Sequence, residues 1–230
     1  MKILETGEIT VAGRLVDASN ATLFVEISDG SSAVKAIYKP VAGERPLWDF
    51  PDGNLASRER AAYLVDQALG FGHIPLTILR DGPFGFGMVQ RWIDVDEEID
   101  LEQYFRERDP QLREVALLDA VINNTDRKIG HLLPDGEGHL YVCDHGVTFH
   151  VDDKLRTVLW QWAGEALTDD EVAALTKLLK SIEGGELAEL EGLLTTDELD
   201  ALINRTSRLI ASKSFPEPNP EWPHIPWPPF

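Results

Sequence analysis

The chain has 230 residues and a formal net charge of -19, with 43% hydrophobic and 27% charged residues. This length and composition predict a folded protein with one sizeable core, or with two small lobes that share a cleft. The acidic balance excludes non-specific binding to nucleic acids and to anionic membranes, because both need a concentrated basic face.

The chain contains one cysteine. It therefore cannot form an internal disulfide or a cysteine-based zinc site, which fits a reducing compartment. The opening residues lack the long apolar stretch of a signal peptide, and no run of about 18 apolar residues could span a membrane. We expect a cytoplasmic protein with no membrane insertion and no nucleic acid partner.

The first 40 residues predict β-strands. Segments 8–16 and 21–29 alternate apolar and polar residues on either side of a turn cluster at 17–20. Segment 31–40 predicts a third strand, and Pro40 ends it because proline cannot donate a backbone hydrogen bond. The chain therefore begins with a β-rich region.

A helix and a hairpin follow. Apolar residues recur at helical spacing over 55–69, and Gly70 suits the C-terminal cap. Residues 73–93 predict two strands around the Gly/Pro turn at 80–85. This helix is the only one predicted before residue 95.

The second part of the chain predicts helices. Thr168 with Glu171 and Thr195 with Glu198 have the spacing of a capping box, which marks a helix start. Apolar residues recur at helical spacing in four segments. The predicted helices cover residues 101–108, 111–123, 169–182 and 197–212.

This order predicts an α+β fold of two lobes joined by an acidic hinge near residues 94–100. Residues 1–95 form a β-rich lobe with one helix, and residues 96–215 form a mainly helical lobe. Residues 216–230 are too rich in proline for helix or sheet, and form either a flexible tail or an extended aromatic strap. Ligands favour clefts between lobes, so we expect the functional site there.

Lys39 and Glu59 are the first candidate pair. Lys39 ends the third strand, and Glu59 lies 20 residues on in the helix of the first lobe. Such a lysine and glutamate can form an ion pair that positions the amine on nucleotide phosphates. Alternatively, Lys39 is a surface lysine at a strand end and Glu59 lies on a solvated helix face.

Asp126, His131 and Asp144 form the second candidate group. They lie in "NNTDRKIGH" (123–131) and "CDHG" (143–146), with a short hairpin predicted between them. The catalytic segment of kinases has the same order, in which an aspartate takes the substrate proton and metal ligands follow. A divalent metal is needed there because the transferring phosphoryl group carries several negative charges. Each motif alone also fits ordinary loop residues.

Several segments together carry a family resemblance. They are "YKP" at 38–40, "RERAAYLVDQALGFGHIPLT" at 58–77, "GMVQRWI" at 87–93, "NNTDR" at 123–127 and "CDHG" at 143–146. These segments resemble landmarks of the phosphatidylinositol 3-/4-kinase-like branch of the protein-kinase-like fold, most of all type II phosphatidylinositol 4-kinases. The whole chain resembles a bacterial family described only as distantly similar to these kinases.

The resemblance implies a nucleotide site for ATP. It implies that Lys39 holds the nucleotide phosphates and that Glu59 orients it. Gln90 and Trp92 would belong to the hinge strand that reads adenine.

The resemblance also implies a catalytic and metal site for Mg²⁺ or Mn²⁺. Asp126 would be the catalytic base and Asp144 the chief metal ligand. The family pattern has asparagine where this chain has His131. Neutral imidazole either binds the metal, which favours manganese-like ions, or only packs and forms hydrogen bonds.

Two further departures concern the phosphates and the acceptor. The glycine-rich phosphate loop is replaced by "VDASNATL" (16–23), where Ser19 and Asn20 either contact phosphate oxygens or form a plain turn. The stretch after Asp144 has only two basic residues, which neighbouring aspartates offset. This argues against an anionic lipid as the phosphoryl acceptor.

We therefore expect a kinase that moves a phosphoryl group from ATP to an unidentified hydroxyl of a protein or small molecule. The first alternative is a nucleotide-binding pseudokinase that acts as a scaffold, and the second is nucleotidyl transfer on the same fold. Arg127 and Lys128 either bind phosphate or satisfy groups of their own loop. The sequence sets no oligomeric state.

Overall fold

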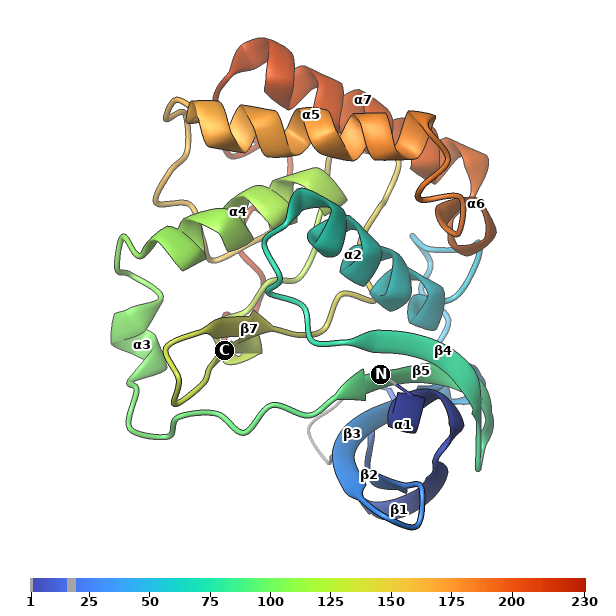
Figure 1. The fold of residues 1–230 in the computed structure, drawn as a ribbon. Helices are drawn as coiled ribbons and strands as arrows, with labels where there is room; N and C mark the ends of the chain where they lie inside the picture. Colours follow the sequence, from blue (N-terminus) through green and yellow to red (C-terminus); the bar gives the residue numbers. More distant parts are fainter. Residues whose placement is uncertain (1, 16–19) are drawn as a thin grey trace.

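A curled antiparallel sheet forms the N-terminal part of the fold (Figure 1). The computed structural model describes residues 2–15 and 20–230. The strand order is β1-β2-β3-β5-β4, and every pair of neighbours is antiparallel. The predicted strands are thereby confirmed. They are β1 (Glu8–Arg14), β2 (Leu23–Ser28), β3 (Ala33–Pro40), β4 (Thr77–Gly82) and β5 (Gly85–Arg91).

A short helix, α1 (Lys2–Thr6), precedes the sheet and was not predicted. Its Leu4 is buried in the core of the sheet. Arg80 of β4 donates hydrogen bonds to the carbonyl oxygens of Leu4 (2.7 Å) and Gly7 (3.0 Å). A helix of this length depends on such tertiary contacts, because its own sequence cannot sustain it.

The C-terminal part is mainly helical, as predicted. Both capping boxes are confirmed, since each threonine oxygen accepts from the glutamate amide and each glutamate carboxylate accepts from the threonine amide. The hairpin expected before Asp144 is also present. The elements are α3 (Leu101–Tyr104), α4 (Pro110–Ile122), η2 (Ile129–His131), β6 (Leu132–Pro134), β7 (Leu140–Val142), α5 (Asp169–Glu183), α6 (Leu190–Leu193) and α7 (Thr196–Ser212).

The helix predicted over 101–108 is wrong in length, because α3 ends at Tyr104. Pro110 occupies the first turn of α4, and Asp109 caps that helix with its side chain on the amide of Gln111. A residue before proline is pushed out of the helical region, and Asp109 has extended torsions. A continuous helix up to α4 is therefore impossible.

The helix predicted between β3 and β4 is α2 (Leu55–Leu69). The Asn54 side chain accepts from the amide of Ser57, which satisfies one free donor at its start. Gly70 ends the helix with φ of 87°, a left-handed conformation that glycine adopts without strain.

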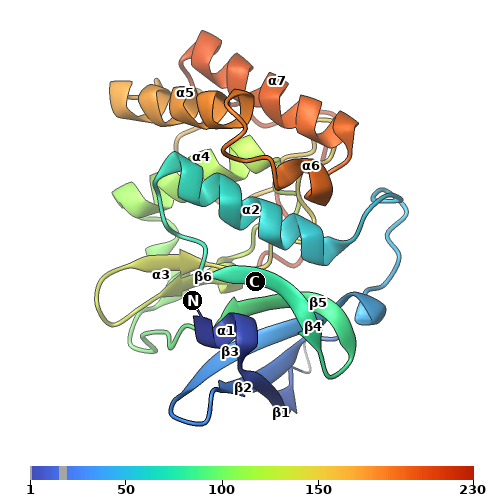
Figure 2. The ribbon, with the colours of Figure 1, turned by 45° about the vertical axis from the view of Figure 1, so that its right-hand side comes forward.

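α2 is packed into the helical part. Its buried Ala61 and Val65 share one core with residues of α4, α5 and α7, whereas the sheet has a separate, smaller core. Arg58 of α2 donates through Nε to a Glu198 oxygen of α7 at 3.1 Å, and both side chains are buried. In both views α2 lies between the sheet and the α5/α7 pair (Figures 1 and 2).

Asp119 of α4 connects this core to the loops that follow. Its carboxylate is fully buried and accepts from the Nε and Nη2 of Arg127 at 3.1 and 3.0 Å. It also accepts from the Asn124 side chain at 2.9 Å and the Thr157 hydroxyl at 3.1 Å. One carboxylate thus fixes both ends of the segment from 124 to 157.

Across residues 2–15 and 20–230, none of the helices has the length and apolar character needed to cross a bilayer.

Replacing Thr195 by alanine tests the cap of α7. The Thr195 oxygen accepts from the Glu198 amide at 3.2 Å, so the change leaves one backbone donor without its partner. We expect the free energy of unfolding to fall by about 1 kcal/mol in urea titrations followed by circular dichroism. Thr195→Ser keeps the hydroxyl and is the matched control, and equal stability of the two variants would contradict the prediction.

Replacing Asp119 by asparagine leaves the Arg127 guanidinium buried without its counter-charge. We expect the free energy of unfolding to fall by about 3 to 5 kcal/mol. The double variant Asp119→Leu/Arg127→Met removes both charges and should lose less stability. A single variant as stable as the double one would show that the pair is not the tie that we describe.

Candidate functional site

Lys39, Glu59 and Asp144 meet at one point of the structure. The Lys39 ammonium lies 2.6 Å from a Glu59 oxygen and 3.0 Å from an Asp144 oxygen. The three residues come from β3, from α2 and from the segment after β7. The predicted lysine and glutamate therefore form an ion pair, and the aspartate 105 positions away shares it.

The local sequence explains why these side chains point to one place. Along β3, Ala36 and Tyr38 are buried in the core of the sheet, so the alternating neighbour Lys39 faces the other side. That side meets α2, where Glu59 is buried. Asp144 follows β7 with φ of 63°, a left-handed conformation uncommon for residues other than glycine.

The charges of this group hold one another in their ionised forms. Burial alone would lower the pKa of Lys39, but Asp144 and Glu59 more than reverse this and raise it above its ordinary value. Burial would raise the pKa of Glu59, but Lys39 lowers it to about 2. Lys39 likewise holds the pKa of Asp144 well below its usual range. The site therefore has two carboxylates and one ammonium at neutral pH.

His131 lies next to Asp144. Its Nε2 is 3.6 Å from an Asp144 oxygen, and the Asp144 side chain is half exposed, so it can reach a ligand. Burial lowers the pKa of His131 to about 4, so the ring is neutral at pH 7. A neutral imidazole beside a carboxylate oxygen is a pair of ligands that fits a divalent metal ion.

The tautomer of His131 places its ring proton on the nitrogen that would bind the metal. The amide of Lys128 points at Nδ1 from 3.4 Å, which makes Nδ1 the acceptor and leaves the ring proton on Nε2, toward Asp144. Metal binding through Nε2 requires that proton to move. Among the residues described, no three histidine, cysteine, aspartate or glutamate side chains are grouped as a metal site. Water and phosphate oxygens would have to supply the remaining ligands.

Asp126 lies near this group but does not share its ion pairs. Its carboxylate is 3.3 Å from the Lys128 ammonium and 3.9 Å from the Arg156 guanidinium. Burial raises its pKa, the two cations oppose this, and the negative charge of Asp144 adds to the rise. A carboxylate with a raised pKa is better suited to accept a proton.

Two residues that were not assigned to the site connect its parts. Arg127 is fully buried, and besides Asp119 it donates to the carbonyl oxygen of Cys143 at 2.9 Å and to Nε2 of His145 at 2.7 Å. The His145 amide donates to the second Glu59 oxygen at 3.0 Å. Of the two open interpretations, Arg127 therefore satisfies its own surroundings. The signal that could have found this network is Asp119, a lone charge in an apolar helical run.

The other predicted nucleotide residues are engaged elsewhere. The Gln90 side chain donates to the Thr77 hydroxyl at 2.8 Å inside the sheet. The Trp92 indole nitrogen donates to Asp94 at 3.0 Å, and its ring lies against Phe24.

Of the predicted phosphate loop at 16–23, the structure describes residues 20–23. The side-chain oxygen of Asn20 accepts from the amide of Arg45 at 2.9 Å. Ser19 lies outside the described residues.

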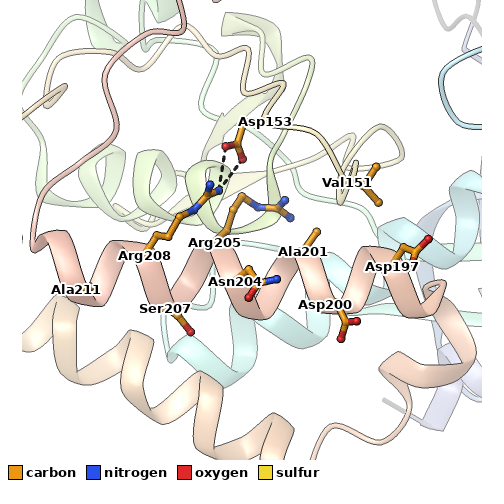
Figure 3. A pocket seen from close by; sticks show the side chains of 10 residues that line it. All are labelled: Val151, Asp153, Asp197, Asp200, Ala201, Asn204, Arg205, Ser207, Arg208 and Ala211. Atoms are coloured by element: carbon orange, nitrogen blue, oxygen red, sulfur yellow. Dashed lines mark hydrogen bonds and ion pairs between the residues drawn. The ribbon is translucent and has the colours of Figure 1, made fainter.

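Hollows of several hundred cubic ångströms border the helical part of the described chain. A cavity of about 690 Å³ lies between segment 95–102 and the Leu132–Pro134 strand, with Gly130 in its wall. A groove of about 810 Å³ lies between α7 and segment 151–153, away from the Lys39 group (Figure 3).

Arg205 lines that second groove and has a structural role. It donates to the carbonyl oxygens of Val121 and His150 at 3.1 Å, which holds the segment after Asp144 against α4 and α7. Figure 3 shows the neighbouring Arg208 facing Asp153, with 2.9 Å between nitrogen and oxygen. The contacts of Arg205 and Arg208 therefore help to hold the segment that follows Asp144 in place.

Several solved structures of kinases have folds similar to this chain. The Golgi casein kinase with Mn/ADP bound matches with a TM-score of 0.60 and 14% identity, over 92% of this chain and 74% of that one. A second structure of the Golgi casein kinase gives 0.57. The Helicobacter pylori proinflammatory kinase CtkA gives 0.50 at 10% identity, over 92% and 94%. The expected two-lobed kinase-like fold is confirmed.

Sequence comparison finds a nearer relative. No model of a protein family matches the chain. Protein Rv2133c of Mycobacterium tuberculosis (strain ATCC 25618 / H37Rv) is 42% identical over 264 aligned positions, which cover 99% of this chain and 94% of the relative. The chain thus belongs to the same family as Protein Rv2133c.

Proposed function

We propose that the protein is an ATP-dependent phosphotransferase that moves a phosphoryl group to a hydroxyl. The observation that carries this proposal is the Lys39 ammonium, bonded at once to Glu59 and Asp144 across the two lobes. Phosphoryl transfer needs little covalent chemistry from the protein, so positioning and neutralisation of charge are the main requirements. A fixed cation beside an exposed carboxylate supplies both.

Each residue of the group has a proposed role. Lys39 contacts the nucleotide phosphates, and Glu59 keeps its ammonium in place. Asp144 and His131 are the residues that would hold Mg²⁺ or Mn²⁺, and the ion offsets negative charge on the phosphate oxygens. The nucleotide reaches the hinge segment through backbone groups, because the Gln90 and Trp92 side chains are occupied.

Asp126 acts as the general base. Its carboxylate takes the proton of the acceptor hydroxyl while the hydroxyl oxygen bonds to the terminal phosphorus of ATP. The bond from that phosphorus to the bridging oxygen breaks, and ADP leaves with the electron pair. Lys128 and Arg156 beside Asp126 favour its ionised form, which is the form that can accept the proton.

The surroundings of the site favour a protein or small-molecule acceptor over a lipid. Lys154 is one of only two basic residues in the stretch after Asp144, and it is already committed. It lies 3.6 Å from an Asp49 oxygen and packs on the rings of Trp48 and Trp222. Few free cations therefore remain there for an anionic headgroup.

Three finer points belong to the proposal. The order of the motifs supports membership of the phosphatidylinositol 3-/4-kinase-like branch. Residues 1–95 act as the nucleotide-binding lobe and 96–215 as the catalytic lobe, followed by the tail at 216–230. The low cysteine content supports a cytoplasmic place of action.

A second candidate is a nucleotide-binding pseudokinase. It is favoured by the pairing of Asp144 with Lys39 and by the proton that the described tautomer of His131 places on Nε2. Both features leave the metal ligands partly occupied. Binding of ATP without transfer to any group would support this candidate.

Thermal unfolding with ATP and MnCl₂ or MgCl₂ tests the nucleotide site. Ligand at about 100 times its Kd adds about 2.7 kcal/mol, which raises the melting temperature by about 5 to 10 °C for a chain of this size. We expect Asp144→Asn to lose this rise. Asp200→Asn removes the same charge from the exposed face of α7 and should keep it. Absence of any rise in the native chain would contradict every nucleotide role proposed above.

Replacing Asp126 by asparagine tests the base. Because the acceptor is not identified, we would measure ATP hydrolysis and labelling of the protein itself. We expect both rates to fall by about 100-fold or more with little change in the nucleotide-induced thermal shift. Mass spectrometry of the labelled native protein should show an added phosphate. An added AMP would instead indicate nucleotidyl transfer. An unchanged rate in the Asp126→Asn variant would remove Asp126 from the mechanism.

A further inference from the structure

The proline-rich end of the chain lies along the catalytic loop. The amide of Thr157 and the indole nitrogen of Trp160 donate to the carbonyl oxygen of His224 at 3.0 and 2.8 Å. The amide of Ile129 donates to the carbonyl oxygen of Pro229 at 2.8 Å. In both views the C-terminal label lies beside the small hairpin, far from the end of α7 (Figures 1 and 2). We call residues 222–230 the strap.

Both docking points of the strap lie on segments that carry or contact Asp126. Ile129 lies three residues after Asp126 in the same loop. Thr157 forms a parallel bridge with Arg127 and follows Arg156, whose guanidinium is 3.9 Å from the Asp126 carboxylate. The strap therefore runs beside the loop 126–130 in the same direction, next to the proposed base.

The contacts are those that an extended peptide makes. Two backbone N–H groups of the enzyme meet two backbone carbonyl oxygens of the strap, and the Phe230 ring lies over Gly130. The ring also forms part of the wall of the 690 Å³ cavity. Backbone donors with an adjoining hollow recognise polypeptides, whereas a small metabolite or a lipid headgroup does not need such donors.

The composition of the strap suits an occupant that does not react. Residues 222–230 contain four prolines and no serine, threonine or tyrosine. Proline keeps the segment extended before it docks, so docking orders little. Without a hydroxyl, the segment cannot accept a phosphoryl group.

The strap is also lightly held. Within it only Pro226 is buried, and the neighbouring Trp227 is 89% exposed. Segments with few buried contacts open at low free energy while the rest of the fold stays closed.

We infer that the strap occupies, in cis, the surface beside loop 126–130 where the acceptor binds, and that this acceptor is an extended polypeptide segment carrying a hydroxyl. The inference rests on the proposed phosphotransferase function and names its substrate class. When the strap leaves, an incoming peptide places a carbonyl oxygen on the Ile129 amide and its hydroxyl next to Asp126. The strap is thus an unreactive mimic of the substrate that lowers the activity of the resting protein.

Two full-length variants test whether the strap docks and releases as inferred. Pro226→Asp places a charge at the one buried position of the strap and should release it. Trp227→Asp makes the same change at the adjacent exposed position and is the control. We expect the amides of Ile129 and Thr157 to exchange hydrogen faster in Pro226→Asp than in the native protein or in Trp227→Asp. The three proteins should have the same melting temperature. Equal exchange in all three proteins would overturn the docking.

Transfer to synthetic peptides tests the acceptor class. The probes are peptides of residues 220–230 carrying Ile225→Ser or Trp227→Ser, supplied with ATP and MnCl₂. If the strap is closed in nine molecules of ten, its release raises the rate of peptide phosphorylation about tenfold. We expect this tenfold rise in Pro226→Asp and no rise in Trp227→Asp. The unsubstituted peptide of residues 220–230 should inhibit phosphorylation of the serine peptides by Pro226→Asp.

The outcomes separate the inference from the function on which it rests. Equal rates in all three proteins, or no transfer to either peptide while the nucleotide still raises the melting temperature, would overturn the inference alone. Loss of the nucleotide-induced rise in every protein would overturn the phosphotransferase proposal. The amide exchange then still decides whether the strap docks on the loop.

Discussion

The buried ion pair between Asp119 and Arg127 is the constraint on which the site depends. Neither charge has access to water, so each needs the other to offset the loss of its hydration. The same arginine reaches the Cys143 carbonyl and the His145 ring, and the His145 amide reaches Glu59. One unit in the core thereby sets the positions of the loop before β6, the segment after β7 and the helix α2.

The Asp119–Arg127 network supports a site whose charged side chains are partly exposed. Lys39 and Asp144 face the boundary between the lobes and are partly exposed, while Glu59 behind them is buried. A buried carboxylate that touches a half-exposed ammonium holds that ammonium without competing with a ligand for the open side. The geometry of Lys39 and Glu59 is thus set in the absence of a ligand.

Much of the fold was predictable, because alternation, helical spacing and capping residues are local signals. The order of Lys39, Glu59 and Asp144 also predicted that they would meet, although their chemical roles remain predictions. Partners set by packing were not predictable. Neither the Asp119–Arg127 pair nor the Gln90–Thr77 bond has a local signature, since each depends on register and loop path. The early end of α3 at Tyr104 likewise has no local signature in the sequence.

The bond between Arg58 and Glu198 has a consequence for how such a protein could be switched. α2 carries Glu59 one position after Arg58, and the buried pair fastens that turn to the last helix of the chain. Swinging this helix outward would break a buried ion pair and open the main core, so such a movement carries a large energetic cost. The Lys39 contacts also involve β3 and the segment after β7, which do not share this buried pair.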